Sequence, residues 1–332
     1  MQKLFAGFVV FAVGILGTSA AYSAGLEIAL TPSAENGADA TVQYSLINQS
    51  SSTVHVLRWQ TPIDGVTNDL FDVRQNGKPV DYVGPLYKRV APRMQDYIEL
   101  KPGESLSAVV DLSAFYDMRG GVAAGIGAFD MSRGSTSVFA DSTPGALDID
   151  SEETRTPIIP LAASNSFVSC SNTRQTQLAT ARNSSVTYAS NSKSYLTAGT
   201  TGSRYTWWFG TYNSSRYSTV RSHFNNIYSA LSSQAYTFNC SCSDSGTYAY
   251  VYPTQPYKVY LCGAFWSAPN TGTDSRAGTL VHETSHFNVV AGTKDNAYGQ
   301  TAAHNLAVSN PTKAVANADS HEYFAENTPA RN

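Results

Sequence analysis

The residues His282-Glu-Thr-Ser-His286 lie in an apolar stretch from about Ala277 to Val290, for which we predict a helix. Positions four apart share one face of a helix, so the two imidazoles can bind one metal ion together. Histidines at this spacing are typical ligands of Zn²⁺. Glu283 can then serve as a general base toward water and pass the proton to a leaving amine. The motif indicates a zinc peptidase, and an incidental histidine pair is the alternative.

A catalytic zinc ion requires a third protein ligand and one open coordination position. A metzincin would carry Gly at position 289 and His at position 292, but this chain has Val289 and Gly292, which excludes that family. Glu322 is conceivable as a thermolysin-type ligand. Asp295 is favoured, because it lies nine residues beyond His286 in a loop between two glycines that can fold back toward the metal. Without the preceding motif, Asp295 would be interpreted as a turn residue.

The motif and its downstream loop resemble the signature of the aspzincins, His-Glu-x-x-His with an aspartate ligand in a GTxDxxYG segment. This chain has HETSH at 282–286 and GTKDNAYG at 292–299. The resemblance covers about residues 165–330, and it is greater to the peptidyl-Lys metalloendopeptidases than to the deuterolysins. Further similar stretches are YTWWFG (205–210), YAYVYP (248–253), LCGAFW (261–266) and NADSHEYFAEN (317–327).

The resemblance implies a role for each matching residue of the motif. His282, His286 and Asp295 would bind one Zn²⁺ per chain, with Glu283 as the general base. Tyr298 would donate a hydrogen bond to the oxyanion that forms during peptide hydrolysis. Simple packing is the alternative for Tyr298, since the chain has 20 tyrosines.

Asp319 and Glu322 are three positions apart, so both carboxylates would face the same way on a helix. In the resembling enzymes, these positions form an acidic S1′ pocket, and cleavage occurs on the amino side of lysine. The resemblance therefore implies a preference for lysine at P1′. Judged from the residues alone, a solvated acidic helix face would be the simpler interpretation.

All four cysteines lie in the second half of the chain, and an even number in an exported protein indicates disulfides. Cys240 and Cys242 are separated by one residue, which makes a bridge between them geometrically poor. Each is expected to have a distant partner. The resemblance implies the pairs Cys170–Cys240 and Cys242–Cys262.

The N-terminus has the layout of a signal peptide. A short basic start precedes an apolar run from Leu4 to Leu16 and small residues from Gly17 to Ala24. We predict a signal peptide at 1–24 and a secreted protein, because the run is short for a membrane span. A retained anchor is the alternative, and no other stretch is expected to cross a membrane. The net charge of −3 gives no indication of a nucleic-acid partner.

Two further regions follow this leader. Residues 25–165 are predicted to be a β-rich propeptide, sandwich-like up to about residue 120 and linker-like after it. The fold class expected is an α+β zincin-type catalytic domain at 166–332, preceded by this mainly-β prodomain. The strands expected in the first region are 40–46, 54–59, 70–73, 97–100, 106–112 and, within the linker, 135–140. The second region is expected to have helices at 172–196, 218–232, 277–290, 300–309 and 314–326, and strands at 247–252 and 259–262.

The prodomain interpretation rests on the resemblance, because secreted aspzincins are made with propeptides. A permanent accessory binding module is the alternative. Tyr87-Lys88-Arg89 is expected in a proline-flanked loop, from which Lys88 could enter the acidic pocket as an intramolecular inhibitor. An ordinary surface pair of basic residues is the competing interpretation for Lys88. Since residues 120–169 contain no lysine, a strictly lysine-directed enzyme could not cut itself there.

The leading hypothesis is therefore a monomeric, secreted zinc endopeptidase that acts on protein or peptide substrates. A broad-specificity, deuterolysin-like protease or toxin is a second possibility. A catalytically inactive binding protein is a third, but retention of both histidines, Glu283 and Asp295 argues against it.

Overall fold

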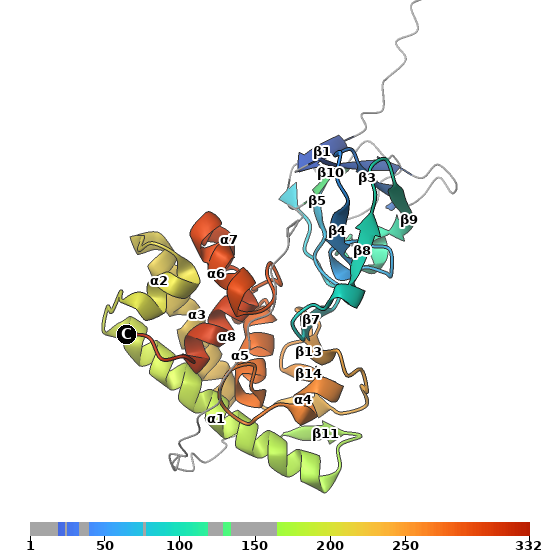
Figure 1. Cartoon of the computed structure of the whole chain (residues 1–332). Helices are drawn as coiled ribbons and strands as arrows, with labels where there is room; N and C mark the ends of the chain where they lie inside the picture. Colours follow the sequence, from blue (N-terminus) through green and yellow to red (C-terminus); the bar gives the residue numbers. More distant parts are fainter. Residues whose placement is uncertain (1–18, 24, 33–39, 76–77, 119–128, 134–164) are drawn as a thin grey trace, which may run out of the picture.

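The computed structural model describes residues 19–23, 25–32, 40–75, 78–118, 129–133 and 165–332. The predicted signal peptide up to residue 18 and most of the predicted linker, including the strand expected at 135–140, lie outside the described residues. Figure 1 shows the described N-terminal strands gathered apart from the helices of the C-terminal region, with one strand, β7, reaching across to them.

The described N-terminal region consists mainly of short antiparallel strands. Three sheets run in the orders β1-β2-β3-β9, β10-β5-β6 and β4-β8. On β3, Val42, Tyr44 and Leu46 are buried at every second position, as the alternation in the sequence predicts. The elements are β1 Ser19–Ser23, β2 Leu26–Pro32, β3 Thr41–Asn48, β4 Val54–Leu57, η1 Arg58–Gln60, β5 Phe71–Gln75, β6 Lys78–Pro79, β7 Leu86–Arg89, η2 Met94–Asp96, β8 Tyr97–Leu100, β9 Ser105–Asp111, η3 Leu112–Ala114 and β10 Phe129–Arg133.

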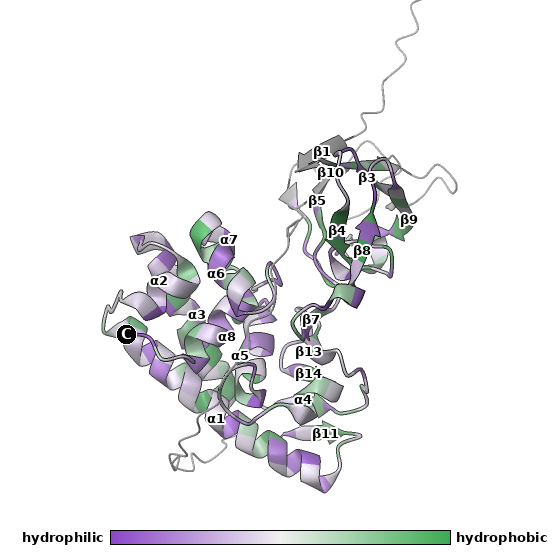
Figure 2. Ribbon diagram, in the orientation of Figure 1, coloured by the Kyte–Doolittle hydropathy of each residue, from purple (hydrophilic) through white to green (hydrophobic). Residues whose placement is uncertain are grey.

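The C-terminal region mixes helices with one sheet. Its elements are β11 Ser166–Val168, α1 Asn172–Thr197, α2 Ser203–Phe209, α3 Ser214–Ser233, β12 Thr237–Asn239, β13 Thr247–Val251, β14 Lys258–Leu261, α4 Gly263–Ser267, α5 Arg276–His286, α6 Gln300–Ser309, α7 Pro311–Val315 and α8 Ala318–Glu326. Figure 2 shows hydrophobic and hydrophilic residues interleaved along α1. Its buried positions recur every three or four residues, which places one face of the helix against α3, α5 and α8.

The sheet of the C-terminal region has a fifth strand from the N-terminal region. Its order is β11-β12-β14-β13-β7, and β7 pairs antiparallel with β13 (Figure 1). The sequence interpretation placed residues 87–89 in a loop, and this was wrong. Pairing with an edge strand some 160 positions away determines the conformation here, and local sequence patterns do not report such a distant contact.

Two predicted helices end earlier or break because of the loop that follows α5. The helix expected at 277–290 ends at His286, and Gly292, with φ of 59°, then lets the chain turn back. The helix expected at 314–326 divides into α7 and α8. Its break lies where Lys294 forms a bridge with Asn317, since the Lys294 amide donates to the Ala316 carbonyl at 2.8 Å.

Two disulfides join the segments around this sheet. Cys170 is bonded to Cys240, and Cys242 is bonded to Cys262. These are the pairs that the family resemblance implied. Among the described residues, no helix is both long enough and apolar enough to cross a bilayer.

Candidate active site

Helix α5 positions the histidine motif inside the protein. The Ser275 hydroxyl caps the helix by accepting a hydrogen bond from the Gly278 amide. Every residue from Ala277 to His286 is buried, with α8 and α1 packed against the helix. Polar residues are thus buried along with apolar ones, which is costly unless another group satisfies them.

The loop after α5 brings Asp295 to the two histidines. Asp295 Oδ1 lies 3.2 Å from His282 Nε2 and 3.3 Å from His286 Nε2. One ligand atom from each of the three residues lies within 4.8 Å of the other two. None of these buried atoms has a hydrogen-bond partner among the described residues. Unpaired buried nitrogen and carboxylate atoms that converge in this way fit the donor set of a catalytic zinc ion.

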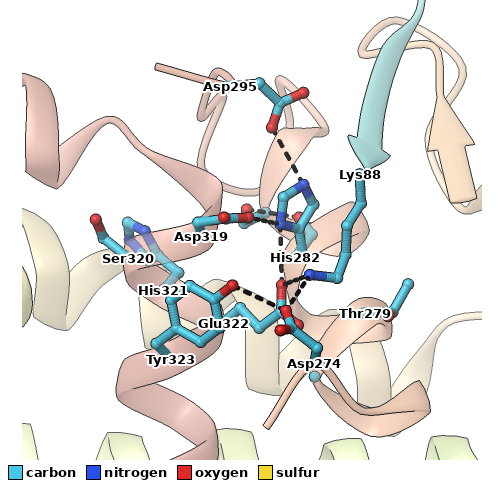
Figure 3. A network of polar contacts seen from close by, with 12 residues as sticks. Lys88, Asp274, Thr279, His282, Asp295, Asp319, Ser320, His321, Glu322 and Tyr323 are labelled. Atoms are coloured by element: carbon cyan, nitrogen blue, oxygen red, sulfur yellow. Dashed lines mark hydrogen bonds and ion pairs between the residues drawn. The ribbon is translucent and has the colours of Figure 1, made fainter. Parts of the chain in front are cut away.

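Neighbouring groups fix the orientation of both imidazoles. His286 Nδ1 donates to the Thr293 carbonyl at 2.9 Å. His282 Nδ1 lies 2.9 Å from Asp319 Oδ1 and 3.1 Å from Glu322 Oε2 (Figure 3). With Nδ1 used in this way, each Nε2 faces Asp295 with its lone pair free for a metal.

The ligand loop, residues 292–299, is held by hydrogen bonds from several directions. The Asn317 side chain accepts from the Asn296 amide at 2.9 Å and from the Ala297 amide at 3.0 Å. Asn68, from the N-terminal region, donates to the Asp295 carbonyl at 3.0 Å. The sequence interpretation missed Asn317, although a polar residue just before a predicted acidic helix could have suggested a role.

Glu283 and Tyr298 are the predicted catalytic pair, and both are buried. Neither Glu283 oxygen has a hydrogen-bond partner among the described residues, and burial raises the pKa of the carboxyl to about 8. The Tyr298 hydroxyl is likewise without a partner, and its pKa is raised well above the ordinary value, first by burial and then by Asp295. The Tyr298 ring packs edge-on against Trp59 at 6.0 Å. Both polar ends are thus available to react with a substrate.

Lys88 on β7 enters the acidic pocket beside this centre (Figure 3). Its ammonium lies 2.7 Å from Glu322 Oε2 and 3.2 Å from Asp274 Oδ1, and its side chain is 1% exposed. The Tyr248 ring lies 4.8 Å from the same nitrogen. Burial lowers the pKa of Lys88, but Glu322 and Asp274 outweigh it, so the pKa stays well above its ordinary value. A charged lysine is therefore buried against carboxylates and tyrosine rings.

Asp319, on α8 with Glu322, lies between His282 and the ligand loop. Its Oδ1 faces the His282 ring, and its Oδ2 accepts from the Gly299 amide at 2.6 Å. Burial raises the pKa of Asp319. The positive charge of Lys88 and the contact with His282 lower it by more, so the pKa of Asp319 is below its ordinary value. Asp319 thus supports His282 and the 292–299 loop, while Asp274 contacts the ammonium and Glu322 contacts both the ammonium and His282.

The N-terminal region also contacts the ligand loop directly. Asp69 Oδ2 lies 3.1 Å from Lys294 Nζ, next to the bond between Asn68 and Asp295. Together with the contact of Trp59 on Tyr298, these form a second set of contacts around the site.

Comparison with known proteins identifies the family. The model of the aspzincin family, described as lysine-specific metallo-endopeptidase, matches residues 194–326. An extracellular protease of Aeromonas hydrophila is 40% identical over 328 residues, which cover 93% of this chain and 94% of that protein. The chain belongs to the aspzincin family. It is a zinc metalloendopeptidase that acts on proteins or peptides.

Other peptidases are similar over the whole chain or about half of it. A peptidyl-Lys metalloendopeptidase of Armillaria mellea is 36% identical over 360 residues, with complete coverage of both proteins. One from Pleurotus ostreatus is 60% identical over 165 residues, which cover 49% of this chain and 98% of that protein. A solved zinc peptidase from Grifola frondosa, 55% identical, covers 49% of this chain and 100% of its own, with a TM-score of 0.48.

Proposed function

We propose that this aspzincin is secreted as a precursor and matures into an endopeptidase that cleaves the peptide bond on the amino side of lysine. The observation that carries the proposal is the Lys88 ammonium, buried between carboxylates next to His282. A pocket that holds the chain's own lysine can hold a substrate's lysine in the same way. Related proteins named peptidyl-Lys metalloendopeptidases support this specificity.

His282, His286 and Asp295 are proposed to hold the zinc ion. When bound, zinc polarises the substrate carbonyl and lowers the pKa of water. Glu283 takes the proton from the attacking water and transfers it to the leaving amine. Its unpaired, buried oxygens, with a pKa raised to about 8 by burial, suit a group that gains and loses a proton.

Tyr298 and Asp319 complete this mechanism. The Tyr298 hydroxyl, which lacks a partner among the described residues, donates to the carbonyl oxygen as negative charge develops there. Asp319 Oδ1 lies 2.9 Å from His282 Nδ1, and its negative charge helps to hold that ring in the orientation needed for binding. Asp319 is thus assigned to support of the metal site, in addition to the acidic surroundings of the lysine.

The N-terminal region, residues 25–165, is proposed to act as an inhibitory prodomain for the catalytic domain at 166–332, after a signal peptide at 1–24. Strand β7 occupies the free edge of β13, an edge that an extended substrate could pair with instead. Lys88 fills the pocket, and Asn68 and Asp69 contact the ligand loop. A relative about half as long as this chain supports a catalytic domain that stands alone.

Export and the oligomeric state follow from the same proposal. Two disulfides and a relative named an extracellular protease support secretion. The mature enzyme is proposed to act as a monomer. Since residues 120–169 contain no lysine, release of the prodomain requires another protease or a cut outside that stretch.

Peptide mapping tests the specificity. The matured protein is incubated with a mixed protein substrate, and the new peptide ends are identified by mass spectrometry. Lysine is expected as the first residue of most new N-termini. Cuts spread over many residue types would instead support a broad-specificity protease. N-terminal sequencing of the matured wild type and of Glu283→Ala shows whether the chain releases its own prodomain.

Latency is tested in the uncut precursor. Lys88→Ala is expected to leave the pocket open and to give the precursor measurable activity on a lysine peptide. Lys101→Ala, at an exposed lysine of the same region, is the matched control and should stay latent. Equal latency of both variants would contradict the role of Lys88.

A further inference from the structure

We propose that Asp274 is the second carboxylate that binds the substrate's lysine, and that it determines specificity together with Glu322. This inference rests on the proposed function, because it treats Lys88 as the mimic of a substrate side chain. Asp274 lies in the loop just before α5, and no sequence motif draws attention to it.

Two carboxylates approach the Lys88 ammonium from different elements. Glu322, on α8, lies 2.7 Å from it, and Asp274 lies 3.2 Å from it (Figure 3). The face of Tyr248, on β13, covers the same nitrogen at 4.8 Å. An ammonium has three donors, and here it meets two carboxylate oxygens and an aromatic ring.

The other acidic residue of the predicted pocket is already engaged elsewhere. Asp319 uses one oxygen toward His282 Nδ1 and the other toward the Gly299 amide. Asp274 is therefore the second carboxylate, after Glu322, that contacts the ammonium directly. Asp319 still contributes negative charge near the ammonium, but it is Asp274 and Glu322 whose oxygens lie within 3.2 Å of the nitrogen.

The position of Asp274 is fixed by its neighbours. The Tyr323 hydroxyl donates to Asp274 Oδ1 at 2.8 Å, which orients the carboxylate. The Asp274 backbone has φ of 51°, a left-handed conformation that costs energy in residues other than glycine, though less in Asp and Asn. Its amide donates to Glu326 Oε2 at 3.1 Å, and this bond helps to hold the strained backbone.

Helix α5 approaches the carboxylates of α8 closely at Gly278. A Cβ added at Gly278 would lie 2.0 Å from Glu326 Oε1 and 3.0 Å from Glu322 Oε1. Glycine is thus needed where α5 passes beneath these carboxylates. Two single oxygens that converge on one point suit a primary ammonium on an unbranched chain better than a planar guanidinium.

The test is Asp274→Asn in the full chain, expressed as the precursor and matured. Asn retains an acceptor for Tyr323 and tolerates the left-handed backbone, so it removes mainly the charge. We measure kcat/KM for two peptides that differ only in lysine or norleucine after the scissile bond. In the variant, kcat/KM for the lysine peptide is expected to fall roughly ten- to hundredfold, because a hydrogen bond to a charged group is worth that much. The kcat/KM for the norleucine peptide should change little.

Controls separate this inference from the proposed function. Asp244→Asn, at an exposed carboxylate of the same region, should retain the wild-type ratio of the two peptides. If the wild type prefers lysine and Asp274→Asn keeps that ratio, the role of Asp274 is overturned and the proposed function stands. If the wild type shows no preference for lysine, the proposed specificity falls, and this inference falls with it.

A second variant covers the case in which Asp274→Asn fails to fold. Tyr323→Phe leaves the carboxylate in place but removes the hydroxyl that orients it. The kcat/KM of Tyr323→Phe is expected to fall severalfold for the lysine peptide and to stay unchanged for the norleucine peptide. An unchanged ratio in Tyr323→Phe would then overturn the inference.

Discussion

The zinc site and the lysine pocket are neighbours that share His282. They differ in whether their buried polar groups have partners within the chain. At the zinc site, His282 Nε2, His286 Nε2 and Asp295 converge without hydrogen-bond partners among the described residues. In the pocket, Glu322 is paired with the ammonium of Lys88. The atoms of the first cluster are left for a group from outside the chain, whereas the second cluster is paired with the chain's own Lys88.

Metal removal should have the largest effect on activity. It should change the zinc site and leave the lysine pocket intact. Chelation of the matured enzyme is expected to reduce casein hydrolysis to background, and added zinc should restore it. The unfolding temperature should fall as well, since zinc at 1,000 times its Kd stabilises a fold by about 4 kcal/mol. Full activity in chelator would contradict the assigned metal site.

Glu283→Gln should come next, because it removes proton transfer and leaves the metal ligands intact. We expect kcat to fall roughly 10²- to 10⁴-fold, with one zinc per chain still bound. Peptide kinetics and metal analysis of the same sample check both parts. Asp244→Asn, at an exposed carboxylate of the C-terminal region, is the control. If the variant loses zinc along with activity, the assignment of Glu283 as base rather than ligand is wrong.

Lys88→Met in the precursor tests the second cluster, the lysine pocket. The unfolding free energy should fall by about 3–5 kcal/mol, because the buried Glu322 carboxylate loses its partner. Denaturant unfolding of Lys88→Met and of Lys101→Met gives the difference. Adding Glu322→Gln to Lys88→Met should recover part of the loss, since it removes the unpaired charge. Additive losses in the double variant would mean that the pair is not coupled.

The smallest effect concerns a contact between α3 and α8, where His223 is partly buried and His321 is buried, instead of charged groups. His321 Nε2 lies 3.0 Å from His223 Nδ1, and burial lowers the pKa of His223 to about 4 and that of His321 to about 3. Both rings take up protons on unfolding at acid pH, so their contribution to stability is present above about pH 6.5 and is lost as the pH falls toward 4.

His223→Gln should therefore weaken this pH dependence. Between pH 7 and pH 5, the wild type is expected to lose of the order of 1 kcal/mol more unfolding free energy than the variant. Urea unfolding at the two pH values measures this, with the zinc concentration held constant. An identical loss in both proteins would show that the histidine pair does not contribute.

Local spacing in the sequence was sufficient to predict that His282, His286 and Asp295 come together. His282, Glu283 and His286 lie within five consecutive positions of one helix, and a glycine-bounded loop of eight residues returns Asp295 to them. Helix geometry places residues four apart on the same face. The proximity of the two histidines can therefore be predicted without knowledge of the fold. The resemblance to aspzincins added Tyr298, Asp319 and Glu322.

The lysine pocket was decided by the tertiary structure. Lys88 meets Asp274 across 186 positions of the chain, and it arrives on a strand that forms only against β13. An isolated aspartate before a helix carries no periodic pattern, and a short basic segment has no fixed conformation until an edge strand pairs with it. The sequence determines contacts whose spacing is local, whereas the pocket depends on segments that meet only when the whole chain is folded.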